Sequence, residues 1–182
     1  MRSCPSKSVI PASSQQHIDA LVERHSRNGV FLDANLLLVL ALGRYNPLSI
    51  AKHPHTSAFS NADFRFLEAF VGEFSAIVST PNVLTEVGNL AGKLDRRFWA
   101  DFRGAFGAMI KVIDERVCES KIVADNRYFA KLGLTDAAIL ELGAQKFLLL
   151  TADFPLSQIA QTIGFDVLNY NHLRPLVWEL KF

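Results

Sequence analysis

Asp33 and Asp153 each follow directly on an apolar run, VFL at 30–32 and FLLLTA at 147–152. Such runs predict buried strands, and an unpaired carboxylate in that setting is costly or takes up a proton instead. Asn35 stands two positions after Asp33. Each acid therefore needs a partner. For Asp33 two roles are open: a cap on the apolar helix predicted behind it, or a ligand to a cation.

Glu86 and Asp136 are expected at the same edge of the sheet as the two strand-end acids. Glu86 falls in the second turn of a helix predicted from Pro81, and Asp136 falls in the first turn of one predicted over TDAAILELGAQ. Sites in parallel α/β sheets form at the carboxyl ends of the strands. We therefore expect the four carboxylates to converge, although Glu86 alone could be a solvated helix residue and Asp136 a first-turn acid favoured by the helix dipole.

Four converging carboxylates would repel one another and hold protons unless cations neutralised them. Ligand sets made only of oxygen, with several waters retained, suit Mg²⁺ or Mn²⁺. A pair of such ions ~3.5–4 Å apart can activate water and stabilise the leaving oxygen of a phosphodiester. The sequence thus predicts a site for one or two ions, with catalytic and metal-binding residues Asp33, Glu86, Asp136 and Asp153.

Four stretches together resemble the PIN-domain family, which includes VapC-type ribonuclease toxins and RNA-processing nucleases: FLDANLLL, STPNVLTEVGNL, LGLTDAAIL and LLLTADF. The resemblance spans residues 29–170. It implies a Mg²⁺- or Mn²⁺-dependent endoribonuclease in which the same four acids bind the metal. It also implies that Asn35 and Thr151 are supporting polar residues. The stretch 44–74 is longer than the family usually has, and residues 1–28 lie outside its core.

The resemblance also implies partners. RNA would be the substrate, and members of the family are commonly homodimers. If the chain is the toxin of a toxin–antitoxin pair, a small antitoxin protein should cover the acidic site. Two alternatives stay open: a PIN-like RNA-binding protein without turnover, and an aspartyl-phosphate phosphoryl-transfer enzyme with Asp33 as nucleophile. A phosphatase of the haloacid-dehalogenase type would have Asp where this chain has Asn35.

Other features with functional potential have a plainer interpretation. The histidines of KHPHTS, His53 and His55, are expected in a loop. The aromatic stripe over residues 98–106 is expected in the core or at a dimer surface rather than as a base-stacking platform. One group of basic residues could hold RNA phosphates, although an ordinary solvated helix face explains it better. This group consists of Lys93, Arg96, Arg97 and Arg103.

Strands that alternate with helices predict an α/β fold with three α/β/α layers, a mainly parallel central sheet and an extra N-terminal helix. The expected organisation is a flexible leader and helix over 1–28, then a PIN-like domain over 29–182. Strands are predicted at 30–33, 75–80, 146–153 and 165–170, with a strand or irregular link at 112–118. Helices are predicted at 15–29, 34–43, 62–74, 81–94, 95–111, 120–133, 135–145 and 155–164.

Composition sets broad limits. The 182 residues suit one domain, and 49% hydrophobic with 20% charged residues is ordinary for a globular protein. The net charge of +1 gives no global basic field, and no serine-hydrolase or phosphate-loop motif is present. Two cysteines, Cys4 and Cys118, indicate a reducing, cytoplasmic setting. No apolar run approaches the ~18 residues of a membrane span.

Overall fold

A five-stranded sheet in which every pairing is parallel forms the centre of the computed structural model, which describes residues 12–142 and 146–179. The strand order is β3-β2-β1-β4-β5. The predicted α/β class is therefore confirmed. The strands are β1 (Val30–Leu32), β2 (Ile77–Ser79), β3 (Asp114–Glu115), β4 (Leu148–Thr151) and β5 (Val167–Asn169).

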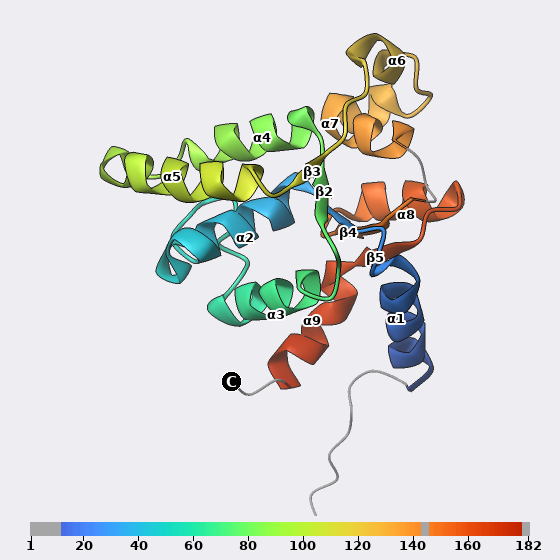
Figure 1. Ribbon diagram of the computed structural model, residues 1–182, viewed down its shortest axis with the longest axis horizontal. Helices are drawn as coiled ribbons and strands as arrows, with labels where there is room; N and C mark the ends of the chain where they lie inside the picture. The colour runs from blue at the N-terminus through green and yellow to red at the C-terminus, as the bar shows by residue number, and fades with distance from the viewer. Residues whose placement is uncertain (1–11, 143–145, 180–182) are drawn as a thin grey trace, which may run out of the picture.

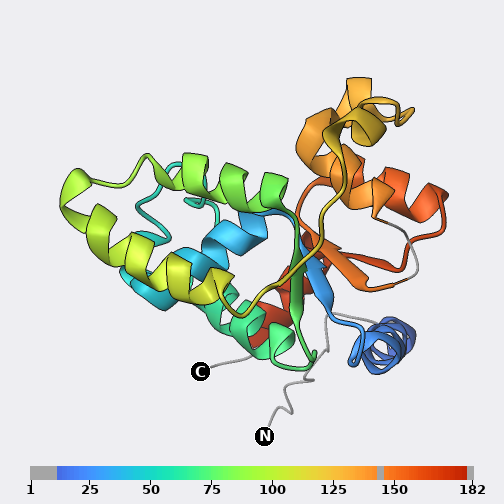
Figure 2. The same cartoon turned by 45° about the horizontal axis from the view of Figure 1, so that its top comes forward.

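Helices cover both faces of this sheet, and the predicted three layers are confirmed (Figures 1 and 2). The helices α2 to α5 lie on one side, and α1 and α8 lie on the other (Figure 2). Their bounds are α1 (Ala12–His25), α2 (Ala34–Tyr45), α3 (Asn61–Val71), α4 (Pro81–Ala91), α5 (Trp99–Ile110), α6 (Ser120–Ala124), α7 (Phe129–Glu141), α8 (Phe154–Thr162) and α9 (Tyr170–Glu179). Short 3₁₀ turns occur at Pro47–Ser49 and Arg96–Phe98.

The helix α2 is the centre of the core. Its sequence ANLLLVLALG is apolar on every side, which predicts a helix buried all round, and residues 36–43 are all buried. It packs against α3, α4 and α5. Gly43 allows the closest of these contacts, because a Cβ atom at this position would overlap the Phe64 ring of α3.

The strand order reverses between β1 and β4, since the chain moves outward to β2 and β3 on one side and later to β4 and β5 on the other. Val30 and Leu32 pair with Leu148 and Leu150, so the two strands end together. Ligands of open parallel sheets bind outside the carboxyl ends of the strands at this reversal. The two strand-end acids therefore emerge at the position where such folds place a site.

The structure differs from the sequence-based expectations in a few places. The first helix begins at Ala12 rather than near residue 15, and α9 was not predicted at all. The helix expected over 120–133 is divided into α6 and the first part of α7, and the one expected from residue 135 forms the second part of α7. The break between the two parts is at Gly133, whose φ of 78° suits glycine. Of the flexible leader, residues 1–11 with Cys4 lie outside the described residues, as do 143–145 and 180–182.

The aromatic stripe of α5 belongs mostly to the core, because Phe102 and Phe106 are buried and only Phe98 is exposed. The stripe therefore offers little surface for a dimer. Across the described ranges, none of the helices has the length and apolar content needed to span a membrane.

Candidate metal centre

Asp33 ends β1 and begins α2, and its carboxylate is fixed on both sides. Its Oδ1 accepts a hydrogen bond from the Leu36 N–H at 2.8 Å, which caps α2. Its Oδ2 accepts from the Thr151 hydroxyl at 2.5 Å and from the Ala152 N–H at 2.7 Å. The side chain is 3% exposed. Asp33 is thus a helix cap. A carboxylate has about four acceptor positions, and the hydrogen bonds from Leu36, Thr151 and Ala152 leave one of them for a cation.

Asp153 repeats this arrangement one strand further along the sheet. It caps α8 by accepting from the Leu156 N–H at 2.7 Å. Its own N–H donates to the Thr151 hydroxyl oxygen at 2.9 Å. Because Thr151 accepts from Asp153 and donates to Asp33, this buried hydroxyl joins the two acids. Thr151 therefore contacts both strand-end acids, and its supporting role in a metal site stays a prediction.

Glu86 and Asp136 face the strand ends from two helices. Glu86 lies half-buried in α4, whose start is fixed by the Thr80 cap and by Pro81 in the first turn. Asp136 lies half-buried in the part of α7 that follows the Gly133 break. The break lets this segment restart near the strand ends, and α7 packs against both α4 and α8.

Three of the carboxylates act electrostatically on the fourth, Asp136. The pKa of Asp136 is raised from 3.8 to about 7, first by burial and then by the negative charges of three neighbours. Burial also raises the pKa of Asp33, against the opposing effect of the hydrogen bonds from Leu36, Thr151 and Ala152. The neighbours that raise the pKa of Asp136 are Asp33, Asp153 and Glu86. The structure thus brings all four predicted acids into one electrostatic cluster.

The chemistry of this cluster fits a hard divalent cation. Carboxylate oxygens are the ligands that Mg²⁺ and Mn²⁺ prefer, and none of the four takes part in the ion pairs found among the described residues. The arrangement is more open than a filled site, because within 12–142 and 146–179 no three Asp, Glu, His or Cys side chains already form a metal-holding group. A cation would therefore have to draw Glu86 and Asp136 toward the fixed strand-end acids.

A cleft of about 590 Å³ opens beside Glu86, between α4, the segment before α6 and the start of the second part of α7. Asn82, Thr85 and Asn89 of α4 form one wall, and Leu134 and Thr135 form another. Cys118 also lines it, and burial is the first cause of the raised pKa of its thiol, followed by Glu141 and Glu119. A substrate group in this cleft would lie next to Glu86, the one of the four acids that lines it.

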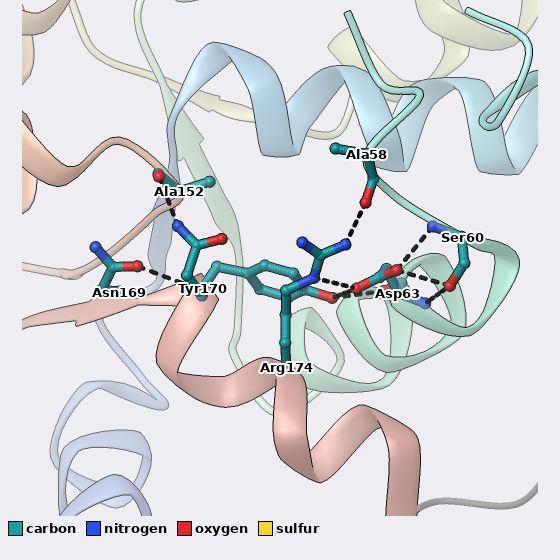
Figure 3. Close-up of polar contacts among 8 residues, drawn as sticks. Ala58, Ser60, Asp63, Ala152, Asn169, Tyr170 and Arg174 are labelled. Carbon is teal, nitrogen blue, oxygen red and sulfur yellow. Dashed lines mark hydrogen bonds and ion pairs between the residues drawn. The ribbon is translucent and has the colours of Figure 1, made fainter.

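The C-terminal helix α9 supports the strand-end turn from the other side (Figure 3). The Asn171 side chain donates to the Ala152 carbonyl at 2.9 Å, and its N–H donates to Asn169 Oδ1 at 3.0 Å. The peptide between Ala152 and Asp153 is therefore held at both ends, by Asn171 at its oxygen and by Thr151 at its N–H. This contact restrains the backbone that carries Asp153.

A buried polar cluster fastens α9 to α3 (Figure 3). The Tyr170 hydroxyl donates to Asp63 Oδ1 at 2.9 Å, and Arg174 Nε donates to the same oxygen at 3.2 Å. Asp63 also forms a capping box with Ser60. Burial would raise the pKa of Asp63, but these hydrogen bonds outweigh it and hold the pKa below its ordinary value. Burial, then the Asp63 charge, raises the pKa of Tyr170.

The remaining predicted residues lie apart from the acids. Asn35 is exposed, and no hydrogen bond joins it to Asp33 within the part of the chain that the structure describes. His53 and His55 lie in the loop expected for them, beyond the far end of α2, with His53 buried and its pKa lowered by burial and then by His55.

The basic group is exposed at the opposite end of α4 from the strand ends (Figure 1). The length of α4, at 1.5 Å per residue, separates the basic group from the strand ends by about 15 Å. Arg97 pairs with Asp95, and Arg103 stacks on Trp99. The prediction that these residues bind RNA stays untested, and the ordinary solvated face describes what is seen.

Ala152, Asn171 and the cleft residues were not predicted from the sequence. Asn169 ends β5 and Asn171 lies two residues beyond it, so the rule that polar residues at the end of a strand mark the site could have found them. Comparison of the chain with models of protein families, with curated proteins and with solved structures gave no match. The interpretation of this site therefore rests on its own residues.

Proposed function

We propose that this protein is a Mg²⁺- or Mn²⁺-dependent endoribonuclease of the PIN type. One observation carries the proposal: Asp33, Asp153 and Glu86, from three other segments, lie within electrostatic reach of Asp136 near the reversal of strand order, and their charges add to burial in raising its pKa to about 7. Such a cluster is unfavourable at neutral pH without a cation, and structures keep such an arrangement mostly at functional sites.

Each acid has a distinct part in this proposal. Asp33 and Asp153 are rigid ligands, because each is held by backbone N–H groups at a helix start. Glu86 and Asp136 are the adjustable ligands on the cleft side. When bound, the ions would supply a hydroxide near neutral pH and stabilise the leaving oxygen of the phosphodiester. Asp136 would give up its proton as the cation binds, since metal ligands bind deprotonated.

Cleavage of RNA tests the proposal. The wild-type chain should cut single-stranded RNA in Mg²⁺ or Mn²⁺ and stop when EDTA is added. Asp33→Asn and Asp136→Asn should lose detectable cleavage while circular dichroism stays unchanged. Asp101→Asn, an exposed acid of α5, is the matched control and should cut at the wild-type rate. Cleavage by Asp136→Asn at that rate would show that the site is elsewhere.

Binding of RNA without turnover is the second candidate, and the open arrangement of the four carboxylates favours it. Tight RNA binding with no cleavage across Mg²⁺ and Mn²⁺ titrations would establish it. An aspartyl-phosphate mechanism is less well supported, because Asp33 is buried and both of its oxygens already accept hydrogen bonds.

The toxin role is a further part of the proposal. A toxin of this kind would act on cytoplasmic RNA, form a homodimer and be blocked by an antitoxin that covers the acids. Expression of the chain alone should then slow bacterial growth, and Asp136→Asn should relieve the effect. Equal growth inhibition by the wild type and this variant would contradict the toxin role.

A further inference from the structure

Two surfaces border the acids, a cleft and an exposed aromatic ring. The cleft lies on the α4 side, beyond β2, and Phe154 lies at the start of α8, beyond β4. Asp33 lies between them at the end of β1. Glu86 lines the cleft and Phe154 directly follows Asp153, so each surface borders one of the four acids.

The lining of the cleft excludes phosphate and suits a polar, uncharged group. No Lys, Arg or His is among the described residues that line it, and Glu86 and Glu119 make it negative. Amides, hydroxyls and apolar side chains complete the walls, with Asn82, Asn89, Thr135, Val117 and Leu134 among them. A volume of about 590 Å³ is within the ~300–1,000 Å³ of small-molecule sites.

Phe154 is 56% exposed, immediately after Asp153. Its Cβ is placed by the cap and the first turn of α8, so the ring is carried by a fixed backbone. An exposed aromatic ring beside a candidate phosphodiester site offers a stacking face to a base, which is worth ~1–3 kcal/mol per base and does not depend on which base is stacked.

We propose that the substrate strand is bound through unpaired nucleobases on both sides of the reacting phosphate, one in the cleft and one stacked on Phe154. The proposal rests on the proposed ribonuclease function and adds the residues that would hold the bases next to the cleaved bond. Asn82 and Asn89 border the cleft seven residues apart on α4, and an amide can pair with the edge of a base through both a donor and an acceptor. A base in a duplex is stacked and paired, so it could reach neither surface.

Kinetics of two variants test this inference. Phe154→Ala and the double variant Asn82→Ala/Asn89→Ala should each raise KM for a single-stranded oligonucleotide about tenfold, the effect of one lost base contact, with kcat within twofold. The double variant should also relax the base preference at the cleavage site, and Phe154→Tyr should keep the wild-type KM. Phe98→Ala, which removes another exposed ring far from the acids, is the control and should leave KM unchanged.

The outcomes separate this inference from the proposed function. If the wild type cuts RNA but either Phe154→Ala or the double variant keeps its KM within twofold, the base-binding inference is wrong and the ribonuclease stands. Base binding is equally contradicted if the wild type cuts duplex RNA as fast as single strands, or if these variants lose only binding of a partner protein.

If the wild type cuts no RNA, the ribonuclease proposal fails and NMR titration with uridine and adenosine decides the inference. Saturable shifts of the Asn82 and Asn89 side-chain amides would support base binding in the cleft. Their absence up to millimolar nucleoside would overturn it.

Discussion

At the scale of single residues, Asp136 holds the clearest consequence. Its pKa of about 7 in the folded chain, against 3.8 unperturbed, means that the folded chain keeps a proton that the unfolded chain loses. Between pH 4 and 7 the folded state therefore binds more protons than the unfolded state, and the free energy of unfolding falls as the pH rises through this window. At ~1.4 kcal/mol per pKa unit, Asp136 lowers it by up to a few kcal/mol.

The variant Asp136→Asn should therefore be more stable than the wild type at pH 8 without metal, and the difference should vanish near pH 4. Guanidinium unfolding of both proteins from pH 4 to 8 measures this difference in stability. Subtracting one free energy of unfolding from the other removes the contributions of the other titrating groups. Saturating Mn²⁺ should shrink or reverse the difference at pH 8. A difference that does not change with pH would mean that Asp136 is not held protonated.

Thr151 is the second residue with a defined consequence. Its buried hydroxyl accepts from the Asp153 N–H and donates to Asp33, so Thr151→Val keeps the shape and removes both bonds. We expect a loss of about 1–3 kcal/mol in the free energy of unfolding and weaker Mn²⁺ binding. Thr162→Val, at an exposed helical threonine, is the control and should change stability by less than about 0.5 kcal/mol. Equal stability of the two variants would contradict the role given to Thr151.

The four acids could be predicted from the sequence, while their surroundings could not. Asp33 and Asp153 follow long apolar runs, and that local pattern already places them at strand ends. The contacts of Thr151 with Asp33 and of Asn171 with Ala152 depend on how distant segments meet, so no spacing in the sequence reveals them. Among the described residues no hydrogen bond joins Asn35 to Asp33, so the supporting role expected for Asn35 stays a prediction.

At the scale of elements, α9 shows what sequence patterns miss. Pro175 lies inside it, and proline normally predicts the end of a helix because it lacks an N–H and clashes with the preceding turn. The helix is nevertheless fixed by its first turns, where the buried Tyr170 and Arg174 reach Asp63 of α3. Tertiary contacts thus decide this element rather than its own helical preference.

Removing the Tyr170 hydroxyl should loosen α9. Tyr170→Phe keeps the ring and takes one hydrogen bond from a buried carboxylate, so we expect a loss of about 1.5–3 kcal/mol in the free energy of unfolding. Tyr128→Phe, at a half-buried ring, should change it by less than about 0.5 kcal/mol. Urea unfolding measures both. A Tyr170→Phe chain as stable as the wild type would show that the contact contributes nothing.

The packing of α2 against α3 gives a prediction of the opposite kind. Gly43→Ala adds a methyl group where the Phe64 ring lies, and such overpacking should cost about 1–3 kcal/mol. Gly104→Ala in α5, where nothing lies within 4 Å of the added Cβ, should instead stabilise the chain by about 0.5–1 kcal/mol. Thermal unfolding of the two variants compares them, and a stabilising Gly43→Ala would contradict the packing.

At the scale of the whole molecule, strand order explains why one edge of the sheet collects the acids. The order β3-β2-β1-β4-β5 reverses between β1 and β4, and open parallel sheets form their sites outside the strand ends at such a reversal. The α/β class followed from alternation along the sequence, because four of the five strands lie in apolar runs, although β3 (Asp114–Glu115) and α9 carry no such signal. The cleft could not be predicted from the sequence, because α4, α7 and the segment before α6 meet only in the folded chain.

Binding of Mn²⁺ to the full chain tests the central claim, that four carboxylates from four segments share one cation site. Electron paramagnetic resonance of added Mn²⁺ gives the free ion directly. We predict saturable binding that strengthens from pH 6 to pH 8 as Asp136 loses its proton, and at least about tenfold weaker binding in Asp33→Asn and Asp136→Asn but not in Asp101→Asn. Wild-type affinity in both site variants, or no binding at pH 8, would contradict the account.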